Sequence, residues 1–134
     1  MKAIHKTAMA ILALTLCASF VMSSATAAVV PYQSEIFISH SVYLPATMKA
    51  EFQATTRKRV ASVSISATLQ VRENGTWTNC DTNVSPSFSG SNKTGWNTTA
   101  DYSSDCEKGS TYRLSVVFAV GDVSVTHISN SRTY

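Results

Sequence analysis

The side chains suited to acid–base or metal chemistry are few in this 134-residue chain and lie scattered along it. The two histidines beyond residue 27, His40 and His127, are 87 positions apart (127 − 40), and they form no local metal-binding motif. No serine stands in a nucleophile elbow, and no glycine-rich loop is suited to phosphate. Asp101, Asp105 and Glu107 lie close in sequence, but a calcium loop has denser and more regularly spaced ligands. The sequence therefore predicts no catalytic residue, no metal site and no cofactor.

Cysteine chemistry is confined to one pair beyond residue 27, Cys80 and Cys106. Their spacing fits neither a redox motif nor a zinc motif. In an oxidising compartment such a pair forms a disulfide by default. The bridge encloses 106 − 80 − 1 = 25 residues, for which chain-entropy accounting gives a stabilisation of about 3–4 kcal/mol. We therefore expect a structural disulfide between these residues.

Two tryptophans are the candidates for binding a partner. A two-residue turn at Asn74-Gly75 places Trp77 beside Arg72 and away from the core, whereas a three-residue loop with a bulge at Gly75 reverses this. Trp96 lies in a stretch rich in Ser, Asn and Thr. Exposed tryptophan is a favoured anchor for carbohydrate or protein partners. The alternative is that both indoles pack into the second face or under a loop. The candidate binding residues are Trp77, Arg72 and Trp96.

The first 27 residues have the pattern of a signal peptide. Basic residues open the chain, an apolar run covers residues 8–21, and small residues close it at Ala27. The apolar run is shorter than the ~20 residues a membrane-spanning helix needs, so a retained anchor is the weaker interpretation. We expect a secreted, extracellular product with no stable membrane insertion after cleavage, and one domain over residues 28–134. Two lysines are removed with the leader, so the remaining chain has 9 basic and 8 acidic residues. This near-neutral balance does not favour nucleic acid as a partner.

Among the structural elements that must position these side chains, two β-hairpins are predicted most clearly. Large apolar residues alternate from Tyr112 to Val120, and Gly121-Asp122 suits a type II′ turn. A second alternation runs from Val63 to Val71 and precedes Asn74-Gly75. In the hairpin at Gly121-Asp122, the residue numbers of each expected pair add up to 243. In the hairpin at Asn74-Gly75, they add up to 149. The pairs expected are Val120 with Val123, Phe118 with Val125, Val116 with His127, Val71 with Thr78, Leu69 with Cys80, and Ile65 with Val84.

Weaker extended segments cover most of the remaining chain. Residues 35–44 suit one or two short strands, residues 48–55 alternate cleanly, and residues 94–100 suit one weak strand. We interpret Arg57-Lys58-Arg59 as a solvated turn, with a heparin or lipid-headgroup contact as the alternative. The tail, residues 129–134, should extend the last strand. About seven short strands with turns between them predict an all-β antiparallel sandwich.

The segment Gly109-Ser110-Thr111-Tyr112-Arg113-Leu114-Ser115-Val116 resembles the penultimate strand of fibronectin type III and immunoglobulin-like domains. In that strand a tyrosine near the start bonds back to the preceding corner, so the resemblance implies a structural role for Tyr112. The order of features, from signal peptide through Asn-Gly-x-Trp to Thr-Tyr-Arg and a final hairpin, is similar to a group of small secreted β-sandwich proteins of Gram-positive bacteria. The resemblance implies an immunoglobulin/fibronectin type III-like sandwich and a location, and it carries no active-site residues.

These observations favour a non-catalytic extracellular or cell-surface binding module. Its expected partner is an extracellular protein or glycan. The alternative is a secreted antagonist, either an enzyme inhibitor or an antibacterial toxin. Small size and export fit an antagonist as well as they fit a binding module. A hydrolase with an unusual site ranks below both.

Overall fold

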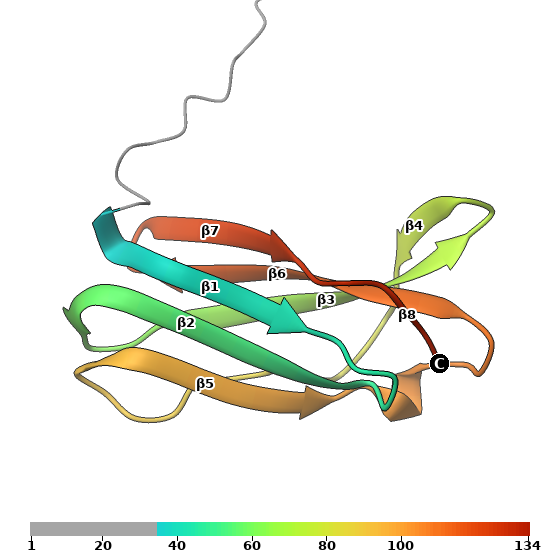
Figure 1. Ribbon diagram of the computed structural model, residues 1–134, viewed down its shortest axis with the longest axis horizontal. Helices are drawn as coiled ribbons and strands as arrows, with labels where there is room; N and C mark the ends of the chain where they lie inside the picture. Colours follow the sequence, from blue (N-terminus) through green and yellow to red (C-terminus); the bar gives the residue numbers. More distant parts are fainter. Residues whose placement is uncertain (1–34) are drawn as a thin grey trace, which may run out of the picture.

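Residues 35–134 are described by a computed structural model, so the leader expected at residues 1–27 and the domain boundary at residue 28 lie outside the described chain. The described chain is built of antiparallel strands and one short 3-10 helix, η1 (Ser103–Asp105), which confirms the all-β class (Figure 1). The strands are β1 (Phe37–Tyr43), β2 (Lys49–Val60), β3 (Ser64–Glu73), β4 (Thr76–Asn79), β5 (Lys93–Asp101), β6 (Thr111–Val120), β7 (Val123–Ile128) and β8 (Arg132–Thr133).

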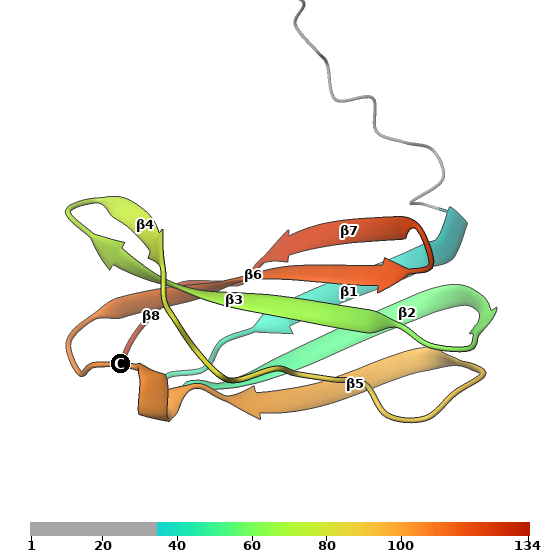
Figure 2. The ribbon, with the colours of Figure 1, turned by 180° about the vertical axis from the view of Figure 1, so that it is seen from behind.

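The strands form two sheets that lie face to face. One sheet has the order β1-β2-β5, and the other has the order β4-β3-β6-β7 with β8 also paired to β6. Strands β7 and β8 follow one another along the same edge of β6, as expected for a tail that extends the final hairpin. The three-stranded sheet is nearer the viewer in Figure 1, and the five-stranded sheet is nearer in Figure 2.

Turn chemistry sets the register of both expected hairpins. Asn74 and Gly75 have φ angles of 51° and 83°, and a type I′ turn requires positive φ at both central positions. Gly121 has φ 57° and Asp122 is not in the positive-φ region, as a type II′ turn requires. The hairpins pair as the position sums predict, with Val71 opposite Thr78 and Phe118 opposite Val125. The two-residue turn at Asn74-Gly75 is therefore confirmed over the bulged alternative.

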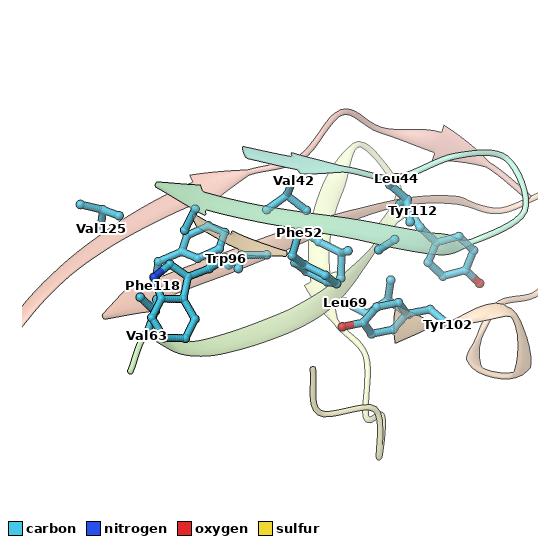
Figure 3. Packing of buried hydrophobic residues seen from close by; sticks show 14 of the residues in the cluster. Val42, Leu44, Phe52, Val63, Leu69, Trp96, Tyr102, Tyr112, Phe118 and Val125 are labelled. Atoms are coloured by element: carbon cyan, nitrogen blue, oxygen red, sulfur yellow. The ribbon is translucent and has the colours of Figure 1, made fainter. Parts of the chain in front are cut away.

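Inward-facing side chains of the two sheets share one core. Phe52 of β2 and Leu69, Leu114 and Phe118 of the five-stranded sheet have no measurable exposure. Figure 3 places Trp96 and Phe118 toward one end of this core and the two buried tyrosines toward the other. Every second side chain of these strands thus faces the core, as the alternation in the sequence predicted.

Two expectations about strand ends are wrong. Strand β2 continues to Val60, so Arg57, Lys58 and Arg59 lie in a strand and not in a turn. The second hairpin ends early: Cys80 N donates to Leu69 O at 2.8 Å, and the expected pairing of Ile65 with Val84 does not form. Residues 80–92 instead cross to the other sheet and lead into β5 (Figure 2). Pro86 and the many Ser and Asn residues there do not favour a continued ladder.

Tyr112 fastens the start of β6 to the chain before it. Its side chain is 3% exposed, and its hydroxyl accepts a hydrogen bond of 2.7 Å from the backbone N–H of Glu107. The structural role that the sequence implied for this tyrosine is confirmed. Tyr102 contrasts with it, because its hydroxyl is buried and has no hydrogen-bond partner in the described chain.

These two tyrosines make a matched pair of substitutions. Tyr112→Phe removes a buried hydrogen bond and leaves the Glu107 N–H unpaired, so it should lower the free energy of unfolding by about 1–2 kcal/mol. Tyr102→Phe removes a buried hydroxyl that bonds to nothing, so it should be neutral or stabilising. Urea unfolding of both variants checks this prediction. Equal losses in the two variants would contradict the role assigned to the Tyr112 hydroxyl.

Candidate functional site

The outer face of the five-stranded sheet carries a tryptophan that two arginines contact. Strand β3 pairs Arg72 with Trp77 of β4, so their side chains leave the same face of the sheet. Arg113 reaches this face from β6, and its Cζ lies 4.3 Å from the centroid of the Trp77 ring; Arg72 Cζ lies 6.0 Å from it. Cation–π contacts of this kind are worth about 0.5–1 kcal/mol at exposed sites. The sequence therefore predicted the position of Trp77 and its neighbour Arg72 correctly.

Two amide side chains complete this cluster. Gln70 accepts a hydrogen bond from Arg113 Nε at 2.9 Å and donates from Nε2 to Asn79 Oδ1 at 2.8 Å. One row of bonds thus crosses β6, β3 and β4. Hereafter these five residues are called the Trp77 platform: Gln70, Arg72, Trp77, Asn79 and Arg113.

The platform lies in a face without acidic groups. By register, the outward positions of β3, β4, β6, β7 and β8 carry hydroxyl, amide and apolar side chains besides the indole and the two arginines, and the apolar ones include the exposed Ile128. None of these outward positions is Asp or Glu. The outward face of the three-stranded sheet differs, because Lys49, Glu51 and Asp101 mix both signs of charge there. The strand positions that share this face by register therefore carry only positive charges, and the nearest acidic groups are Glu73, Asp105 and Glu107, which line a depression beside Arg72.

Trp96 is a core residue, so its assignment as a candidate binding residue is wrong. Its side chain is 2% exposed, and it contacts Phe88 at a ring-centroid distance of 6.1 Å. Strand β5 pairs Trp96 with Ala54, which faces the core. The polar composition around Trp96 suggested an exposed side chain in the expected weak strand, but every second residue of β5 faces inward and Trp96 is one of them. Its Nε1 is buried with no hydrogen-bond partner among the described residues.

The two cysteines are free thiols in the structure, so the expected disulfide is not formed there. Both are half-buried and pack against the core. Burial, followed by the influence of Cys80, raises the pKa of the Cys106 thiol to about 11. Burial is also the main cause that raises the pKa of Cys80, with acidic neighbours acting in the same direction. A bridge needs a Cα separation and side-chain directions that spacing along the chain does not determine.

A small depression borders Arg72 and Cys80 at the end of β3. It has a volume of about 250 Å³, and its lining includes Glu73, Asp105 and Glu107. Asp105 is already engaged, because its Oδ2 accepts a hydrogen bond of 2.7 Å from Thr82 Oγ1. A thiol with a raised pKa is a poor nucleophile at neutral pH, so the depression lacks an activated group.

The two histidines meet where the open edges of the sheets approach each other. His40 of β1 and His127 of β7 have their Nδ1 atoms 3.2 Å apart, and His40 also contacts the Phe118 ring at 5.9 Å. A hydrogen bond between two Nδ1 atoms requires one ring to donate and the other to be neutral. Burial, and next the neighbouring His127, lower the pKa of His40. Sequence reasoning placed His127 opposite Val116 but missed this contact.

Comparison of this chain with known proteins gives no match. No family model, no curated protein and no solved structure matches it. Among residues 35–134 there is no group of three or more His, Cys, Asp or Glu side chains that could hold a metal ion. No helix in this part of the chain is both long and apolar enough to span a membrane.

The histidine pair predicts loss of stability in acid. His40 has a folded-state pKa below its ordinary value of 6.5, so below this pH the unfolded chain binds the proton more readily than the folded chain. Its contribution is complete above pH 6.5 and declines as the pH falls. Thermal unfolding between about pH 5 and pH 8 should show this decline, and His40→Gln should show a smaller one. Parallel pH profiles of the two proteins would contradict the prediction.

The thiols predict slow alkylation of the folded protein. With both cysteines reduced, iodoacetamide at neutral pH should modify the native chain at least about tenfold more slowly than the urea-unfolded chain, because the thiolate is the reactive form. Mass spectrometry over time measures both rates. Equal rates would contradict the raised pKa values. Protein tested without reduction should alkylate at both sites, and two blocked thiols would indicate a bridge that the structure does not contain.

Proposed function

We propose that this chain is a secreted, non-catalytic binding module with an immunoglobulin/fibronectin type III-like fold. The leader pattern of residues 1–27 supports export to the extracellular space. Two facing antiparallel sheets and the bond from the Glu107 N–H to the Tyr112 hydroxyl support the fold. The fold alone does not specify a partner, so the binding assignment depends on the surface of the domain.

The Trp77 platform is the observation that carries the proposal. It combines a half-buried indole, two arginines and a pair of amide side chains on one face. Tryptophan and arginine are the residues most enriched where binding energy concentrates. The indole supplies apolar contact area, and the arginines and amides supply directional hydrogen bonds. This combination suits an extracellular protein or glycan.

Substitution of the two tryptophans separates binding from stability. Trp77→Ala should abolish capture of the partner, while the free energy of unfolding falls by less than about 1 kcal/mol. Trp96→Ala should cost about 3–5 kcal/mol because it opens a cavity in the core. The measurement is a pull-down from cell envelope and culture supernatant, with urea unfolding of each variant in parallel.

Three outcomes of the pull-down are informative. Undiminished capture by the folded Trp77→Ala variant would contradict the assignment of the platform. Capture of an envelope component that requires Trp77 would support the module. Capture of a secreted enzyme whose activity falls on binding would instead favour the antagonist.

A further inference from the structure

We propose that the Trp77 platform binds the carboxylate groups of an acidic polysaccharide, that is, a glycan that contains uronic acids. This inference rests on the proposed binding function and names the class of its ligand.

Arg113 is held in position before any ligand binds. Its guanidinium is stacked on Trp77, and its Nε is committed to Gln70. Its two Nη groups have no hydrogen-bond partner within residues 35–134, so the end of the fork is free. A carboxylate accepts two parallel hydrogen bonds from such a fork. Because the side chain is already ordered, less conformational entropy is lost when the anion binds.

Arg72 supplies a second cation near the first. Arg113 is opposite Gln70, so Arg72 is its diagonal neighbour on the adjoining strand, with Cα atoms about 7–8 Å apart. Arg72 is exposed, and it also borders the depression that Glu73, Asp105 and Glu107 line. Two cations this close suit a polymer with repeated negative charges. The net charge of 9 − 8 = +1 beyond residue 27 means that this attraction is local and does not come from the protein as a whole.

The surroundings of the arginines favour a saccharide over the other polyanions and over a protein. Outward positions near the platform carry hydroxyl groups, among them Thr68, Thr111 and Ser115, which can exchange hydrogen bonds with sugar hydroxyls. Nucleic-acid affinity rises with the number of phosphate contacts, and this face offers only two cations in the described chain. The centre of a protein interface is typically apolar, whereas the apolar side chains of this face, Trp77, Val117 and the exposed Ile128, are interspersed with polar ones.

Titration with oligogalacturonate, its methyl ester and dextran sulfate tests this inference by calorimetry on the folded domain. Oligogalacturonate should bind, and esterification should weaken binding about 10- to 100-fold, because it removes charge-assisted hydrogen bonds. Arg113→Lys keeps the charge but loses the fork, so it should weaken binding by about tenfold or more. Arg59→Lys is the matched control on the other sheet and should leave binding unchanged.

Three results would overturn the inference. The first is equal affinity for the ester, which would leave a neutral glycan as the ligand and the proposed function intact. The second is tighter binding of dextran sulfate with equal losses in Arg59→Lys and Arg113→Lys, which would indicate attraction by charge alone. The third is no binding of any of these glycans. In that case, a pull-down that still requires Trp77 keeps the binding function with a different ligand class, and one that does not require Trp77 removes both proposals.

Discussion

The pairing of β3 with β6 is the constraint on which most of the structure depends. It sets Leu69 opposite Leu114 on the inner face and Gln70 opposite Arg113 on the outer face. Because side chains alternate between faces, a slip of β6 by one residue would turn Arg113 inward and expose Leu114. The hydrophobic core and the Trp77 platform therefore depend on a single register.

Two further interactions of β6 stabilise the same register. Strand β7 continues the ladder through the turn at Gly121, and the Tyr112 hydroxyl holds the beginning of the strand to the Glu107 backbone. A strand paired along both edges and covered on one face is the least mobile part of a sandwich. Arg113 lies in this strand, so the group that we propose to contact an anion is mounted on a rigid element. Binding geometry is more precise on such an element than on a loop.

The core also contains polar atoms that no partner satisfies. Trp96 Nε1 and Tyr102 Oη are both buried without a hydrogen bond among the described residues. Burial, followed by the negative charge of Asp105, raises the pKa of Tyr102 to about 12, so this phenol stays protonated at any physiological pH. These two side chains are large and mainly apolar, and the area they bury outweighs the cost of one unsatisfied atom in each. Neither atom faces the Trp77 platform, so these costs belong to folding and not to binding.

What the sequence alone determined is local. Asn74-Gly75 and Gly121-Asp122 specify their turn types, and alternation with period two specifies which side chains share a face, so both hairpin registers and the position of Trp77 beside Arg72 could be predicted. The tertiary structure decided what depends on distant segments. It buried Trp96, left Cys80 and Cys106 as free thiols, joined two histidines 87 positions apart and brought Arg113 onto Trp77. The physical reason is that turn chemistry acts over a few residues, whereas the packing of one sheet on the other and the order of strands leave no periodic signal in the chain.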